Sequence, residues 1–206
     1  MSPEIAVPVI SNRLLQFFVE AAREQVGAET LPLVLDEVEL SPSVIAAEST
    51  GQLDPHRAAE IYALVQQALR LYYGRGARGI LMRVGQTLWQ KICAGASLAE
   101  KLELQIVRRL PVPARRRRVL EFLAGSLRQA GGQASVHQLD IDLLLMDRSS
   151  AATCGQRAEA PVCYVSLGLV QGALQWATGR EADVEEISCR AAGAVACEFK
   201  VKLGGG

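Results

Sequence analysis

Apolar residues recur three or four positions apart through most of the first 132 residues, which is the spacing of amphipathic helices. Asp54 followed by Pro55 is a helix start signal, because a capping side chain precedes proline at the first helical position. Pro32 and Pro42 interrupt the pattern, so the segment 31–44 is expected to be irregular. Helices are expected at about residues 11–27, 54–74, 79–95, 97–110 and 113–131.

The hydrophobic period changes at the glycine pair 131–132. Apolar residues alternate over 139–145, which favours one or two strands. A helix is expected at about 161–178, and residues 182–203 are typical of two strands joined at Gly193. The sequence therefore predicts an α+β fold, with a helical first two thirds packed on a small antiparallel sheet.

The length of 206 residues suits one domain with one hydrophobic core. We expect residues 1–206 to form a single domain, with a mainly helical part at 1–132 and a strand-helix-hairpin part at 133–203. Residues 204–206 are expected to be a flexible tail.

Composition narrows the classes of partner. The chain has 22 basic and 22 acidic residues, so no net charge attracts it to nucleic acid or to an anionic membrane. No run of about 18 apolar residues predicts a membrane span, and the amino terminus lacks a signal-peptide pattern. We therefore expect a cytoplasmic protein, in which the five cysteines are thiols or metal ligands rather than disulfides.

Several motifs are weak evidence for function. The glycines of 74–79 match a dinucleotide-binding pattern, but a helix precedes them where that site needs a strand, so a helix-to-helix turn is favoured. The arginine run 115–118 lacks interleaved aromatic residues, and a solvated face or an interface is favoured over nucleic acid. His56 and His137 suggest no triad, and no catalytic residue is assigned.

Two glycines lie four residues apart in the last expected helix, at Gly168 and Gly172. Interior glycines weaken a helix by about 1 kcal/mol each relative to alanine. Their expected benefit is the close approach of another backbone or of a ligand, and tight packing of the helix on the sheet is the favoured interpretation.

The segment EEISCRAAGAVACEF places two cysteines at equal distances from Gly193. If the chain turns there, Cys189 lies opposite Cys197, close enough for both thiolates to bind one tetrahedral zinc. Glu186 can join them if a bulge or turn cancels the strand alternation. Cys163, at the start of the preceding helix, is the fourth candidate, and a helix amino end favours its thiolate. The alternative is that these cysteines are small buried hydrophobic residues.

The residues from Cys154 to Val201 resemble the 4-vinyl reductase domain family. The shared pattern is a cysteine in a loop, then Pro-x-Cys entering a helix with Gly-x-x-x-Gly-Ala-Leu. It continues as Glu-x-x-Cys-Arg-Ala-x-Gly-x-x-x-Cys-x-Phe-x-Val, here starting at Glu186. The carboxy-terminal part is the more specific, and the resemblance covers about a third of the chain.

The resemblance implies an antiparallel sheet with flanking helices, similar to vesicle-tethering subunits of the TRAPP type, and dimerisation through helices. In phenol-sensing bacterial activators of this family, the domain holds an aromatic ligand in an apolar pocket near a zinc ion. Carried over by position, the zinc ligands are Cys163, Glu186, Cys189 and Cys197, in a structural role, whereas the role of Cys154 is left open.

We therefore expect a homodimeric domain that binds a small hydrophobic or aromatic molecule in a pocket between the helices and the sheet. Candidates for the pocket wall are Trp89, Phe122, Tyr164 and Trp176, although core packing is the alternative for each. The family name suggests an enzyme that reduces a vinyl group of a chlorophyll-type tetrapyrrole, but no nicotinamide or flavin site is recognisable. A protein-interaction or tethering module is the third alternative.

Overall fold

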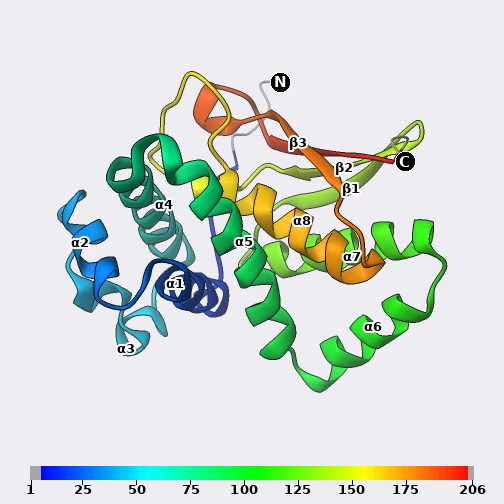
Figure 1. Cartoon of the computed structure of the whole chain (residues 1–206), viewed down its shortest axis with the longest axis horizontal. Coiled ribbons are helices and arrows are strands. Elements are labelled where there is room, and N and C mark those ends of the chain that lie inside the picture. Colours follow the sequence, from blue (N-terminus) through cyan, green and yellow to red (C-terminus); the bar gives the residue numbers. More distant parts are fainter. Residues whose placement is uncertain (1–5, 204–206) are drawn as a thin grey trace.

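The computed structural model of the chain describes residues 6–203, so the expected tail at 204–206 lies outside the described residues. The fold combines helices with one four-stranded antiparallel sheet, which confirms the predicted α+β class (Figure 1). The helices are α1 (Asn12–Val26), α2 (Thr30–Asp36), α3 (Ala47–Thr50), α4 (Pro55–Tyr73), α5 (Ala77–Ala94), α6 (Leu98–Arg109), α7 (Val112–Arg128) and α8 (Tyr164–Thr178). The strands are β1 (Ala134–Leu139), β2 (Asp142–Asp147), β3 (Asp183–Ser188) and β4 (Cys197–Lys202). The assignment of the whole chain to one domain stays a prediction.

The sheet has the strand order β1-β2-β4-β3, and each neighbouring pair is antiparallel. One row across it joins Val136, Leu145, Phe199 and Glu186. Leu145, Phe199 and Glu186 in this row are buried, because α7 and α8 pack against the sheet on that face. Glu186 therefore projects from a hydrophobic row into the interior.

Helices α5 and α8 lie side by side at the centre of the molecule, with α1 to α4 on one side (Figure 1). Their backbones approach closely at glycines. A Cβ atom on Gly168 would clash with the carbonyl oxygen of Met82, and one on Gly85 with that of Val165. The expectation of close backbone approach is confirmed, but its partner was wrong, because the glycines face α5 and not the sheet.

Local signals set most helix boundaries. The Asp54 carboxylate accepts hydrogen bonds from the backbone of His56 and Arg57, and the glycine-rich segment 74–76 is a short turn between α4 and α5, as expected. The prediction of an irregular segment over 31–44 was wrong in part, because α2 forms there. Pro32 lies in the first turn of α2, where its missing N–H removes no helical hydrogen bond.

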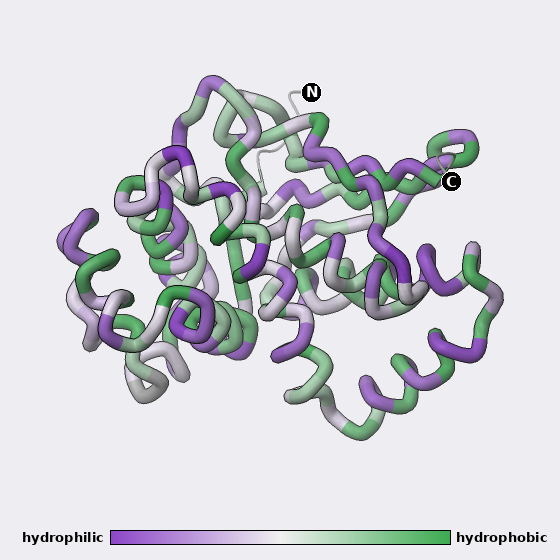
Figure 2. Tube along the Cα trace, viewed as in Figure 1, coloured by the Kyte–Doolittle hydropathy of each residue, from purple (hydrophilic) through white to green (hydrophobic). Residues whose placement is uncertain are grey.

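The described helices present no candidate membrane span; none of them combines the required length and apolar character. The arginine run lies on α7, where Arg117 and Arg118 form ion pairs with Glu121 at 2.8 and 3.0 Å and Arg115 donates to the carbonyl of Leu110. Hydrophobic and hydrophilic residues intersperse along α6 as well (Figure 2).

Candidate metal centre and cavity

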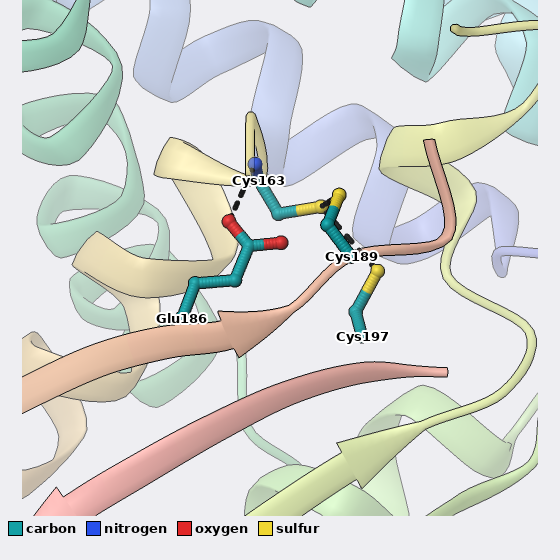
Figure 3. Close-up of side chains that lie close together, drawn as sticks. All are labelled: Cys163, Glu186, Cys189 and Cys197. Atoms are coloured by element: carbon teal, nitrogen blue, oxygen red, sulfur yellow. Dashed lines mark hydrogen bonds between the residues drawn. The ribbon is translucent and has the colours of Figure 1, made fainter. Parts of the chain in front are cut away.

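The structure brings Cys163, Glu186, Cys189 and Cys197 together in one buried cluster (Figure 3). Their candidate ligand atoms lie within 4.8 Å of one another. The Sγ atom of Cys163 is 3.7 Å from that of Cys189 and 3.5 Å from that of Cys197. The five cysteines of the chain are free thiols. Three sulfurs and one carboxylate oxygen form a donor set that can hold a metal ion.

The local backbone explains how these residues converge. Cys163 immediately precedes α8, and Cys197 begins β4. The β3–β4 register shifts between Glu186 and Ser188, so a bulge keeps Glu186 and Cys189 on the interior face. The bulge is the feature that the sequence required for Glu186 to join the cluster.

The expected tight hairpin about Gly193 was wrong in detail. The last paired residues of the two strands are Ser188 and Glu198, so Cys189 lies just beyond the ladder. The connection contains a helical turn at Arg190–Ala192, and Gly193 follows with φ +92°, a left-handed conformation suited to glycine. The expected helix start near residue 161 also moves to Tyr164.

The hydrogen bonds around Glu186 leave one oxygen for a ligand. The backbone N–H of Cys163 donates to Glu186 Oε2 at 2.9 Å. Glu186 Oε1 is buried and has no hydrogen-bond partner among the described residues. A buried carboxylate oxygen without a partner costs free energy, and a cation at the three sulfurs would supply the missing interaction. The residues therefore fit a divalent metal.

The cluster concentrates its negative charge on one thiol. Hydrogen bonds from Cys163 and Cys197 lower the pKa of Cys189, whereas its contact with Cys189 raises the pKa of Cys163 well above the usual value. Burial raises the pKa of Glu186 to about 8. The thiolate expected at Cys163 is therefore found at Cys189. Without a metal, protons hold the other groups neutral near pH 7, and a divalent cation would have to displace them.

Two arginines next to the cluster could not be identified from the sequence. The backbone N–H of Arg190 points to Cys197 Sγ at 3.4 Å, and its Nη2 donates to the carbonyl of Ala6 at 2.7 Å. Arg70 on α4 donates to Gln156 at 2.7 Å, and the sulfurs of Cys163 and Cys189 raise its pKa against the opposing effect of burial. Each guanidinium keeps one buried Nη1 with no partner among the described residues. Their positive charges balance an anionic centre.

A separate enclosed cavity of about 20 Å³ lies between the helices and the inner face of the sheet. Its lining is mainly apolar, and the hydroxyl of Tyr62 hydrogen-bonds Ser166 on α8. Asp147 Oδ1 accepts hydrogen bonds from the N–H and hydroxyl of Ser149, at 2.9 and 3.1 Å. Burial raises the pKa of Asp147 to about 6. This volume holds about one water molecule.

The four aromatic residues named from the sequence do not line this cavity. Trp89 contacts Phe122 and Trp176 edge to face, with ring centroids 6.0 and 5.6 Å apart, in the packing between helices. Tyr164 lies apart from them under Arg78 and lines an open groove of about 540 Å³ beside Glu186. The cavity residues Tyr62, Asp147 and Ser166 carried no distinctive sequence signal.

Comparison with known proteins adds the family. Residues 146–203 match the 4-vinyl reductase domain family. This match confirms the resemblance drawn from the sequence for that part of the chain, and it contains all four residues of the candidate metal centre. No curated protein matches the chain in sequence.

Solved structures share the fold of almost the whole chain, well beyond the matched segment. An H-NOX protein from S. oneidensis in the Fe(II)NO state has a TM-score of 0.54 at 12% identity, over 95% of this chain and 100% of that one. Unliganded Fe(II) H-NOX from K. algicida has a TM-score of 0.55 at 14% identity, over 93% and 95%. The phenol-responsive sensory domain of the transcription activator PoxR, with phenol, has a TM-score of 0.50 at 15% identity, over 84% and 90%. At these identities the likeness shows the fold.

The residues of this chain do not fit the haem implied by the H-NOX structures. A haem needs an axial ligand facing a cavity of its own size. The enclosed cavity has about 20 Å³ and no histidine in its lining. His56 binds the carbonyl of Pro8 through Nδ1 at 2.9 Å, and His137 is exposed on β1 beside Ser135.

Proposed function

We propose that this chain is a sensory domain that binds a small hydrophobic or aromatic molecule and is stabilised by a structural zinc ion. The zinc ligands are Cys163, Glu186, Cys189 and Cys197, and the active form is a homodimer. The observation that carries the zinc proposal is the unpartnered Glu186 Oε1 beside three converging thiols. Three thiolates favour zinc over magnesium or calcium, which prefer oxygen ligands.

The ligand site that we propose is the enclosed cavity. It lies between the helices and the sheet, where the sequence predicted a pocket, and its apolar wall contains the few polar groups that orient a ligand: Tyr62, Asp147 and Ser166. A molecule the size of one aromatic ring exceeds the 20 Å³ cavity, so the lining side chains must move apart on binding. The phenol bound to PoxR makes phenol a suitable first probe.

Native mass spectrometry of the purified full chain tests the zinc, the dimer and any retained ligand together. We expect a mass of two chains with two zinc ions. Zinc absent from protein prepared without chelators would contradict the metal assignment. A monomer mass would contradict only the homodimer.

Calorimetry with phenol tests the cavity. Tyr62→Phe removes a hydroxyl from the cavity wall and should weaken binding roughly tenfold, because one hydrogen bond contributes about 1 kcal/mol. Tyr164→Phe is the matched control, since Tyr164 lies outside this cavity, and it should bind as the wild type does. Weakening by Tyr164→Phe alone would favour the open groove, and no binding of phenol or related monocyclic aromatics would contradict the sensor proposal.

A further inference from the structure

Helix α6 exposes a stripe of large apolar side chains, which we call the α6 stripe: Leu98, Leu102 and Ile106. These residues are 88%, 60% and 53% exposed and are spaced four apart, so they share one face of the helix. The opposite face holds Leu104 and Val107, which are buried against the rest of the protein. A helix with apolar residues on both faces has one face without a partner in the single chain.

Specific contacts hold α6 in place although little of it packs against the body of the molecule (Figure 1). At its start, Ser97 and Glu100 form a capping box, and the Arg13 guanidinium on α1 donates to both carboxylate oxygens of Glu100 at 3.0 and 3.1 Å. At its end, Arg108 stacks on Trp176 of α8 at 4.5 Å. The α6 stripe is thus presented on a fixed helix.

The charges beside the stripe are complementary to those of a second copy. Lys101 and Glu103 precede and follow Leu102 by one residue, so they lie about 100° to either side of the stripe centre. Both are exposed, and neither forms an ion pair within the described part of the chain. When a two-fold axis runs parallel to two such helices, the Lys101 side of one copy faces the Glu103 side of the other. An antiparallel pair would set like charges against each other.

We propose that the α6 stripe is the dimer interface of this protein, with the α6 helices of two copies packed parallel around a two-fold axis. The inference rests on the proposed homodimer and names the surface that forms it. Val112, which is 41% exposed at the start of α7, extends the apolar surface past the end of α6.

Sedimentation equilibrium of the full chain tests this interface. Leu102→Glu should raise the dimer dissociation constant at least a hundredfold, because it places two carboxylates in the centre of an apolar contact. Leu71→Glu is the matched control: Leu71 on α4 is 53% exposed and lies outside the stripe, so this variant should dimerise as the wild type does. Circular dichroism shows whether each variant is folded.

A charge exchange tests the parallel arrangement independently of any large substitution. Lys101→Glu should weaken the dimer, and adding Glu103→Lys should restore it. A monomeric wild type would overturn the homodimer and this interface together. A wild-type dimer that survives Leu102→Glu, or that dissociates with Leu71→Glu, would overturn the α6 interface alone. A dimer that Lys101→Glu does not weaken, or that the double exchange does not restore, would overturn the parallel packing.

Discussion

At the scale of single residues, the candidate metal centre is defined by unsatisfied chemistry. Glu186 Oε1 is buried without a partner among the described residues, and three thiols share space that a metal-free protein would have to fill with protons. Arg70 and Arg190 bring positive charge to the same place. A divalent ion bound by three thiolates and one carboxylate has a net charge of minus two, which these two guanidinium groups offset.

Replacing one ligand should remove the metal. We expect Cys189→Ser to reduce zinc from one ion per chain to a small fraction of that, because a serine hydroxyl is a poor zinc ligand. Elemental analysis by mass spectrometry after gel filtration measures the content. Cys154→Ser is the control, since Cys154 is also buried but lies outside the cluster. Full zinc content in Cys189→Ser would contradict the ligand assignment.

Asp147 should make the protein less stable as the pH rises. Burial raises its pKa to about 6, despite hydrogen bonds from Ser149 and the charge of Arg190, whereas the unfolded value is about 4. The folded protein therefore binds this proton more tightly, and that contribution to stability is complete below about pH 4 and lost as the pH rises through about 6.

The comparison of wild type with Asp147→Asn isolates this effect. Between pH 4 and pH 7 the free energy of unfolding of the wild type should fall by roughly 3 kcal/mol relative to the variant, because the other titrating groups are shared. Urea unfolding at both pH values measures the difference. Equal pH dependence in the two proteins would show that Asp147 is not titrating in this range.

The sequence predicted the residues of the metal cluster better than those of the cavity. Three cysteines and a glutamate in a short, distinctive pattern have few chemical roles, so Cys189, Cys197 and Glu186 were recognisable. Tyr62 and Ser166 belong to ordinary helical patterns, and only tertiary packing brings them to one cavity. The thiolate moved from Cys163 to Cys189 because contacts between the thiols outweigh the effect of a helix end.

At the scale of elements, the pairing of α5 with α8 sets the position of the metal centre. Gly85 on α5 and Gly168 on α8 let the two backbones meet, and α8 carries Cys163 immediately before its first turn. The bulge in β3 sets the other side by keeping Glu186 and Cys189 on one face. The centre therefore joins a helix to two strands through their local irregularities.

A methyl group in the glycine contact should separate α5 from α8. We expect Gly168→Ala to lower the free energy of unfolding by roughly 1–3 kcal/mol, because its Cβ would overlap the Met82 backbone, which has no room to shift. Gly125→Ala in α7 is the control: its Cβ would meet only Arg128 Nη2, at 3.8 Å, so the change should stabilise the helix by up to about 1 kcal/mol. Denaturant unfolding compares the two, and equal effects would contradict the close contact.

Element predictions succeeded where a capping signal or a hydrophobic period was local. Asp54 and the alternating strand residues belong to this class, so α4 and β2 formed as expected. The prediction failed at α2, where two prolines were given too much weight, and at the partner of Gly168, because a helix pattern does not say which neighbour a small residue meets.

At the scale of the whole molecule, the fold of H-NOX and PoxR sensory domains is adapted here to a metal outside the enclosed cavity. Zinc would tie the start of α8 to the β3–β4 connection, and α8 also forms part of the cavity wall. The proposed metal therefore fixes the wall against which a ligand binds. The overall class followed from hydrophobic period alone, whereas the cavity and its size depend on packing.

Removing the metal should loosen the molecule locally before it unfolds. With a chelator, we expect faster amide hydrogen exchange at 186–197 and at the start of α8, because the thiols lose their common partner. Exchange in α4 and α5 should change less. Hydrogen–deuterium exchange by mass spectrometry measures this, and uniform acceleration along the chain would indicate that zinc supports global folding instead.

X-ray absorption spectroscopy at the zinc edge of freshly purified protein tests the central claim most directly. The account predicts one zinc per chain with three sulfur neighbours at about 2.3 Å and one oxygen neighbour at about 2.0–2.2 Å. A zinc shell made only of nitrogen and oxygen, or protein that contains no metal, would contradict it.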